Sequence, residues 1–109
     1  MMVTITRAMP TPWGEAQTIE ELAPSVYSVT TAVHGGILIG KRRAKKLLSE
    51  RAIKIGIPWR RYLAYEEDCD VAAVFYEHPE YGTWTDAKEM KEEAEQNLRR
   101  WYPEYFKNE

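Results

Sequence analysis

Cysteine is almost absent from this sequence, since Cys69 is the only one among 109 residues. A single cysteine excludes an internal disulfide bond and a zinc site with several cysteine ligands, and it is typical of a reducing compartment. No apolar stretch is long enough to cross a bilayer, and residues 1–7 lack the apolar segment of a signal peptide. We therefore expect a cytoplasmic protein that contacts no membrane, located in the host cytoplasm if a phage encodes it.

Signatures of several enzyme classes are missing as well, because the sequence contains no phosphate-binding glycine loop, zinc motif or nucleophile elbow. We therefore expect no cofactor and no metal. The composition is that of a globular domain, with 44% hydrophobic residues, four Trp and seven Tyr. Such aromatic residues fill cores and are also enriched at binding surfaces. The length predicts one domain over residues 1–109.

Charge is distributed unevenly along the chain. Residues 41–61 contain nine basic residues and one acid, a net charge of +8, whereas the whole chain carries −2 at pH 7. The remainder carries −10, with acids concentrated in residues 66–70 and 86–95. Either the basic and acidic helices lie side by side, or each forms a separate face, one for a phosphate-rich partner and one for a basic protein.

The first half of the chain has the two-residue alternation and the turn residues that are typical of β-strands. Residues 11–14 predict a turn and residues 17–22 a short strand. Residues 26–33 predict a longer strand, with Tyr27, Val29 and Val33 on one face. His34-Gly35-Gly36 then predicts a tight turn into a strand at 37–39. Together these segments predict an antiparallel sheet with one buried face.

Helical spacing of apolar residues replaces this alternation after residue 40. One helix is predicted from Lys41 to about Ile55, and a second from about Glu66 to His78, with acids in its first turn. A third follows a cap in residues 83–86 and ends before Pro103. The order predicts an α+β fold, in which a small antiparallel sheet of N-terminal strands and a hairpin packs against three C-terminal helices.

Two short segments carry candidate catalytic groups. His34 precedes two glycines, which would let a ligand approach the backbone; alternatively, the glycines only make the hairpin. Glu66 and Asp70 are four residues apart, a spacing that on a helix would suit Mg²⁺ binding or acid–base catalysis; alternatively, these acids only complement the helix dipole. If the two segments meet in space, His34 and these acids could form an acid–base or metal pair.

Residues 41–61 are the candidate nucleic-acid surface, because phosphates are bound by clustered cations. Trp59 lies beside two of these cations and could stack on a base. Against this interpretation stands the sequence pI of about 5.8, and a solvated helix face is the alternative. The candidate cations are Lys41, Arg42, Arg43, Lys45, Lys46, Arg60 and Arg61.

Three segments of the sequence resemble a family of small uncharacterised domains found in bacteriophages, plasmids and integrated elements. They are Thr11-Pro12-Trp13-Gly14-Glu15-Ala16-Gln17, Val29-Thr30-Thr31-Ala32-Val33-His34-Gly35-Gly36-Ile37 and Tyr65-Glu66-Glu67-Asp68-Cys69-Asp70. Family members often have tryptophan after the third segment, whereas this chain has Val71. The resemblance implies an accessory protein of a mobile element and supplies no activity.

This setting leads to three functional hypotheses. The first is a stoichiometric inhibitor of a host defence system such as a CRISPR complex, which would cover a basic, nucleic-acid-binding surface with carboxylates. The second is a nucleic-acid- or nucleotide-binding module that uses residues 41–61. The third is a small metal-dependent hydrolase that uses His34 and the acids of residues 66–70, although we lean away from an enzyme. The candidate partner-binding acids are Asp86, Glu89, Glu92, Glu93, Glu95, Glu67 and Asp68.

Overall fold

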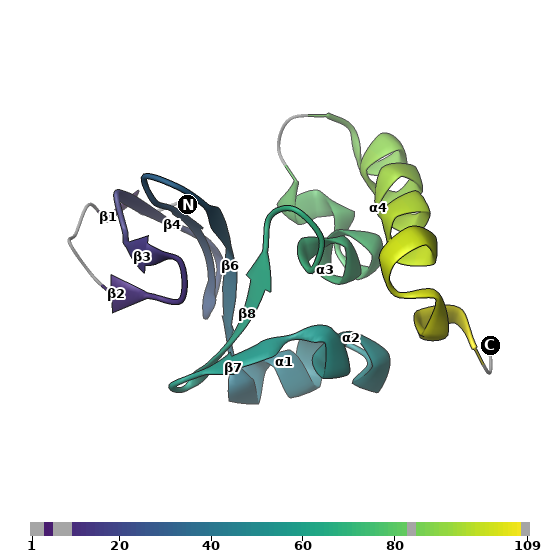
Figure 1. The fold of residues 1–109 in the computed structure, drawn as a ribbon, viewed down its shortest axis with the longest axis horizontal. Helices are drawn as coiled ribbons and strands as arrows, with labels where there is room; N and C mark the ends of the chain where they lie inside the picture. The colour runs from purple at the N-terminus through teal and green to yellow at the C-terminus, as the bar shows by residue number, and fades with distance from the viewer. Residues whose placement is uncertain (1–3, 6–9, 83–84, 108–109) are drawn as a thin grey trace.

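The computed structural model describes residues 4–5, 10–82 and 85–107. In this part of the chain, eight strands and four α-helices form an α+β fold (Figure 1). The strands are β1 Thr4–Ile5, β2 Pro10–Thr11, β3 Gly14–Glu15, β4 Thr18–Ala23, β5 Val26–Thr30, β6 Gly35–Gly40, β7 Ile57–Trp59 and β8 Tyr62–Glu66. The helices are α1 Lys41–Leu47, α2 Glu50–Ile55, α3 Val71–Glu77 and α4 Ala87–Trp101, with the 3-10 turns η1 Pro79–Tyr81 and η2 Pro103–Phe106.

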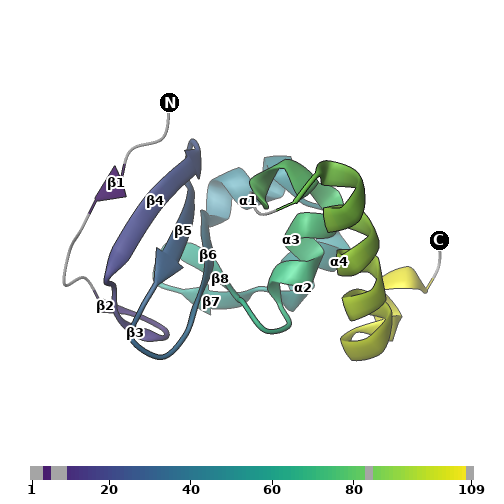
Figure 2. The same ribbon diagram turned by 90° about the horizontal axis from the view of Figure 1, so that it is seen from above.

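Six strands form one antiparallel sheet in the order β1-β4-β5-β6-β8-β7, and β2 and β3 form a separate two-stranded hairpin. The register places Tyr27, Leu38 and Ala64 side by side in one row across β5, β6 and β8. The next row contains Ser28, Ile37 and Tyr65, whose side chains lie on the opposite face because successive strand residues alternate. Figure 2 shows the helices gathered on one side of the sheet, away from the β2–β3 hairpin.

The helix-covered face of the sheet contributes to the larger of two hydrophobic clusters. Ile39 and Tyr65 are fully buried there against residues of α3 and α4 such as Val74 and Leu98. The hydroxyl of Tyr65 donates a hydrogen bond of 2.9 Å to the carbonyl oxygen of Ala52 in α2. This bond satisfies a polar group that would otherwise be costly to bury.

A second cluster lies on the other face of the sheet, where we had expected solvent. It contains Val29, Leu38 and Ala64, each about 1% exposed, with Trp13 and Tyr62 packed against it. The β2–β3 hairpin supplies Trp13, so this short segment covers part of the sheet. The central strand β6 is therefore buried on both faces.

The α+β prediction is confirmed, but several element boundaries are wrong. The strand predicted over 26–33 ends at Thr30, and the turn spans residues 31–34, closed by a 2.9 Å hydrogen bond from the Thr31 N–H to the His34 carbonyl. Gly35 and Gly36 lie inside β6 rather than in the turn. Val33 lies in the turn and is 74% exposed, so it does not share the face of Tyr27 and Val29.

The helix predicted over 41–55 is two helices. Helix α1 ends at Leu47, and α2 begins after Ser49, whose hydroxyl accepts a hydrogen bond of 3.2 Å from the Ala52 N–H. Serine is a favoured N-cap residue. The direction of the chain therefore changes in the middle of the basic segment.

The β7–β8 hairpin lies between α2 and α3 and was not predicted from the sequence. The second predicted helix starts at Val71 rather than near Glu66, because residues 62–66 form β8 and residues 67–70 form a turn. Its first turn therefore contains no acid. With α1 and α2 separate, four helices accompany the sheet in the described residues rather than three.

The last predicted helix is confirmed as α4. The carboxylate of Asp86 accepts a hydrogen bond of 2.9 Å from the Glu89 N–H, and Met90, Ala94 and Leu98 are buried. Trp101 continues the helical spacing of these three residues but is 56% exposed. Residues 83–84 of the predicted cap lie outside the described residues. None of the helices in the described ranges has the length and apolar composition needed to cross a membrane.

We predict that Gly36→Ala destabilises the fold strongly. A Cβ atom at residue 36 would collide with the carbonyl oxygen of Tyr65 and would lie 2.8 Å from the indole of Trp13. Overpacking of this kind costs about 2–4 kcal/mol in the free energy of unfolding. Gly40→Ala in the same strand is the control, because its Cβ would meet only the Ser25 side chain, at 3.3 Å. Urea denaturation measures both variants, and equal losses would contradict the prediction.

Candidate functional site

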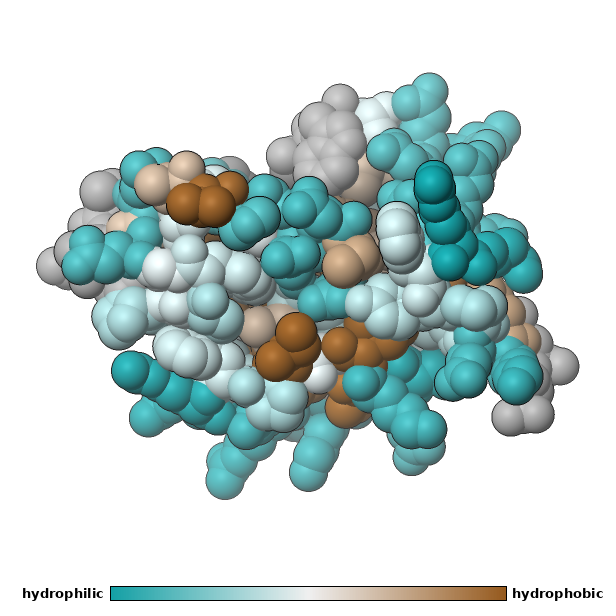
Figure 3. Space-filling model, viewed as in Figure 1, coloured by the Kyte–Doolittle hydropathy of each residue, from teal (hydrophilic) through white to brown (hydrophobic). Residues whose placement is uncertain are grey.

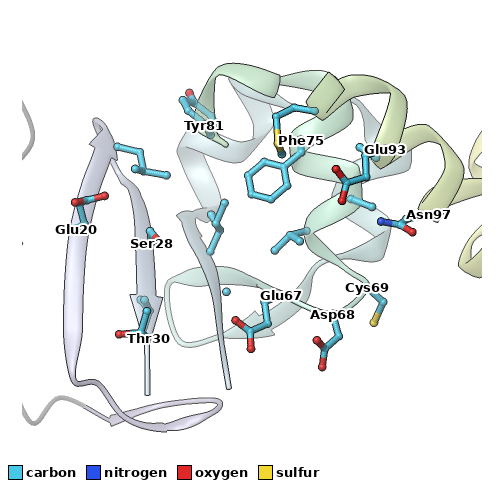
Figure 4. A pocket seen from close by; sticks show the side chains of 18 residues that line it. Glu20, Ser28, Thr30, Glu67, Asp68, Cys69, Phe75, Tyr81, Glu93 and Asn97 are labelled. Atoms are coloured by element: carbon cyan, nitrogen blue, oxygen red, sulfur yellow. The ribbon is translucent and has the colours of Figure 1, made fainter. Parts of the chain in front are cut away.

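A cleft of about 250 Å³ opens between the helix-facing side of the sheet and helices α3 and α4 (Figure 4). Its apolar part is lined by Leu22, Ile37, Phe75 and Met90, which come from β4, β6, α3 and α4. Each of these segments contributes to the main core, so the inner part of the cleft is rigid. The predicted acids Glu67, Asp68 and Glu93 lie on this cleft.

Four carboxylates surround this apolar part. Glu20 comes from β4, Glu67 and Asp68 from the turn after β8, and Glu93 from α4. Figure 4 shows Glu20 on a strand and Glu93 on a helix at opposite sides of the opening, with Glu67 and Asp68 next to each other on the turn between them. No Lys or Arg is among the described residues that line the cleft. The site therefore has a negative rim over an apolar floor.

The turn that holds Glu67 and Asp68 is fixed by its contacts with β6 and the preceding turn. The Glu67 N–H donates a hydrogen bond of 2.9 Å to the Gly35 carbonyl. Nδ1 of His34 lies 3.9 Å from a carboxylate oxygen of Asp68. The side chains of His34 and Asp68 are 44% and 69% exposed, so this is a surface contact of small energetic value.

The three segments that carry the family resemblance meet at this end of β6. Trp13 of the first segment packs against Gly36 of the second, and the Thr31 hydroxyl donates a hydrogen bond of 3.2 Å to the Trp13 carbonyl. Gly35 in turn accepts the hydrogen bond from Glu67 of the third segment. The resemblance therefore corresponds to one compact junction, next to the mouth of the cleft.

Asp70, one of the candidate catalytic acids, is buried and hydrogen-bonded. It is 5% exposed and accepts a hydrogen bond from the hydroxyl of Tyr102, and its other oxygen lies 3.4 Å from the Glu66 N–H. The Cys69 sulfur lies 3.5 Å from the same carboxylate. Glu66 ends β8 and does not share a helix face with Asp70, so that prediction is wrong.

His34 therefore meets the acidic turn, but through Asp68 rather than through Glu66 or Asp70. Within the described ranges, no group of three His, Cys, Asp or Glu side chains is placed to hold a metal ion. The arrangement offers one exposed imidazole–carboxylate pair, of which Asp68 lies on the rim of the cleft.

The predicted acids of α4 have different environments. Glu93 lines the cleft, whereas Asp86 caps the helix and Glu89 accepts a hydrogen bond from the Thr85 hydroxyl. Glu95 forms an ion pair with Arg99 at 2.9 Å. Glu92 is exposed on the helix and does not line the cleft. Of the seven partner-binding candidates, three share one site: Glu67, Asp68 and Glu93.

The basic candidates occupy two segments that lie next to each other. Five lie on α1: Lys41, Arg42, Arg43, Lys45 and Lys46. Arg60 and Arg61 occupy the β7–β8 turn, where the Arg61 carbonyl accepts a hydrogen bond of 2.8 Å from the Lys41 N–H. This bond places the start of α1 beside the turn. All are exposed except Arg43, which is half-buried.

Glu20 is the carboxylate of the cleft that was not predicted from the sequence. It lies in a short strand between Ile19 and Glu21, and alternation alone does not show which of the two glutamates faces the helices. The register settles the question, because Glu20 pairs with Ser28 on the helix-facing side.

We predict that the Cys69 thiol ionises at a higher pH than an ordinary cysteine. Burial raises its pKa most; the hydrogen bond from Tyr102 lowers it less, and the nearby Asp70 charge raises it further. Only the thiolate reacts with iodoacetamide, so the midpoint of the rate against pH should lie above about 8.5 in the folded protein. Mass spectrometry measures the rate, and the urea-unfolded chain is the control. Equal midpoints in the two states would contradict the prediction.

Comparison with known proteins identifies the family and nothing more specific. Neither the curated proteins nor the solved structures give a match. A family described as Domain of unknown function (DUF7007) matches residues 6–109, which confirms the expected membership of a family of uncharacterised domains. The chain belongs to this family.

Proposed function

We propose that this chain is a stoichiometric binding protein whose acidic cleft captures a basic segment of a partner protein. The observation that carries the proposal is the convergence of four carboxylates, from three separate parts of the chain, around one apolar floor. Complementary charge speeds association and selects the partner, while apolar contact in the centre supplies affinity.

The size of the cleft favours a side chain of a protein over a free small molecule. Its volume of about 250 Å³ lies below the range of roughly 300–1,000 Å³ that is usual for small-molecule sites. A Lys or Arg stem, or an aliphatic side chain next to one, could lie against Phe75 and Met90 while its charge meets Glu67 or Glu93. The occupant we propose is therefore an amphipathic basic segment.

The resemblance to domains of mobile elements supports a more specific version of this proposal. In that version a phage or plasmid supplies the chain to the host cytoplasm, where it inhibits a defence complex such as a CRISPR complex. The cleft would engage cations with which the complex holds nucleic acid, since carboxylates and phosphates bind the same basic side chains. Inhibition of this kind needs one copy per target and no catalytic group.

The hydrolase hypothesis has less support from the geometry. His34 pairs with the exposed Asp68, and Asp70 is buried under Tyr102. His34 is not among the described residues that line the cleft, whereas acid–base chemistry requires a base within reach of the bound substrate.

The proposal predicts that reversing charges across the cleft abolishes partner capture in a folded protein. Glu67 and Glu93 are exposed and come from different elements, so Glu67→Lys with Glu93→Lys should leave the fold intact. Immobilised protein is incubated with host lysate, and captured proteins are identified by mass spectrometry. With the captured partner purified, the association rate should fall by at least about tenfold in this variant.

Glu92→Lys with Glu104→Lys is the matched control. Both residues are exposed, neither lines the cleft, and the change in net charge is the same. Circular dichroism verifies that both variants are folded. A partner that is lost by the cleft variant and kept by the control supports the proposal. A partner that both variants bind with the wild-type rate would refute it.

A further inference from the structure

The outer face of the sheet, opposite the cleft, carries a row of aromatic side chains. Trp59 of β7 is paired with Tyr62 of β8 in the sheet register. The ring of Tyr62 contacts the ring of Tyr27 from β5 edge to face, with 6.2 Å between the centroids. All three side chains pack against the outer cluster and are half-buried. We call Tyr27, Tyr62 and Trp59 the aromatic row.

Cations lie at one end of this row. Arg60 and Arg61 form the two-residue turn directly after Trp59, and the Arg60 guanidinium lies 5.3 Å from the centre of the Trp59 ring. The hydrogen bond between Lys41 and Arg61 places the start of α1 beside the same turn, and Arg42 follows it. The four exposed cations thus come from two segments that are distant in the sequence. In Figure 3, hydrophilic side chains project along the lower edge, where Figure 1 places α1 and this turn.

Arg60 has the backbone conformation of the first residue of a two-residue hairpin turn. Its φ of 54° is in the left-handed region, where glycine or asparagine is the usual residue. The chain nevertheless has an arginine here, and the turn directs its guanidinium over the neighbouring indole. A residue in an unfavourable conformation is a common feature of binding sites.

We propose that the aromatic row and the four cations bind single-stranded nucleic acid. Bases would stack on Trp59, Tyr62 and Tyr27, and the phosphates would contact Arg60, Arg61, Lys41 and Arg42. Stacking on aromatic rings tolerates any base, because every base has a π face. The bases of a duplex already stack on one another, so the row discriminates in favour of single strands. Glu21, opposite Tyr27 in the register, marks the end of the surface.

This site is independent of the cleft. The row containing Tyr27 and Leu38 lies on the opposite face of the sheet from the row containing Ser28 and Ile37, which lines the cleft. A failure of one proposal therefore leaves the other unaffected.

The test measures the fluorescence anisotropy of labelled oligo(dT) and oligo(rU) of about 12 nucleotides, a length within the range of single-strand sites. We expect binding that weakens steeply between about 50 and 200 mM salt, because bound phosphates release counterions. An unlabelled duplex of the same length should compete poorly. No binding at low salt, or equal competition by the duplex, overturns the proposal.

Two variants locate the site. Arg60→Gly with Lys41→Ala removes two cations, and glycine at position 60 suits the backbone conformation, so this variant should fold. It should weaken binding and reduce the salt dependence. Lys88→Ala with Lys107→Ala removes the same charge from exposed positions outside the surface and should bind as the wild type does. Equal weakening in both double variants overturns the proposal.

Stacking is tested separately with Trp59→Leu, after its fold has been checked. Loss of one stacked base weakens binding between roughly fivefold and 150-fold. Unchanged affinity in a folded Trp59→Leu variant contradicts stacking on the row. If this variant does not fold, Tyr62→Leu provides the same measurement, and the Arg60→Gly double variant still tests the location.

Discussion

The indole of Trp13 lies against Gly36 on one face of β6, while Ile37 and Ile39 of the same strand pack toward the helices on the other. Strand β6 is paired on both edges and buried on both faces, so few substitutions in it would leave the packing intact. This constraint explains why residue 36 is glycine, since the Trp13 indole and the Tyr65 carbonyl leave no room for a Cβ atom. The same constraint explains why three segments distant in the sequence meet at one point.

A strand covered on both sides also separates the molecule into two faces with different chemistry. The helix-facing side ends in a cleft with acids on its rim, whereas the outer side carries aromatic rings next to four cations. Two parts of the basic segment also meet in space, because the start of α1 lies beside the β7–β8 turn. A partner that contains both basic protein surface and nucleic acid would match both faces.

The sequence predicted those parts of the fold that local signals specify. Helix α4 has an Asp N-cap, an apolar stripe and a proline after its end, and each of these signals is local in the sequence. The β7–β8 hairpin was missed because its turn is Arg60-Arg61, which lacks the glycine or asparagine that marks such turns. The aromatic residues Trp59, Tyr62 and Tyr65, which favour strands, were the available signal.

The candidate site could be predicted only in part, because it depends on register and long-range packing. The acids at 67–68 and 93 were recognised as binding candidates, but their placement on one cleft follows from α4 packing on α3 beside the sheet. The acids at 66 and 70 were misinterpreted, because a strand followed by a turn replaced the expected helix. Buried polar contacts such as that of Asp70 with Tyr102 leave no pattern in the sequence.

The central claim is that the sheet separates two independent binding surfaces. Backbone amide chemical shifts of ¹⁵N-labelled protein, recorded during titration with a Lys- and Leu-containing peptide and separately with oligo(dT), test it most directly. The account predicts that the peptide shifts the amides of Glu67, Asp68 and Glu93, and that the oligonucleotide shifts those of Trp59, Arg60 and Tyr62. Both ligands shifting the same set of amides, or a peptide that leaves the cleft amides unchanged, would contradict it.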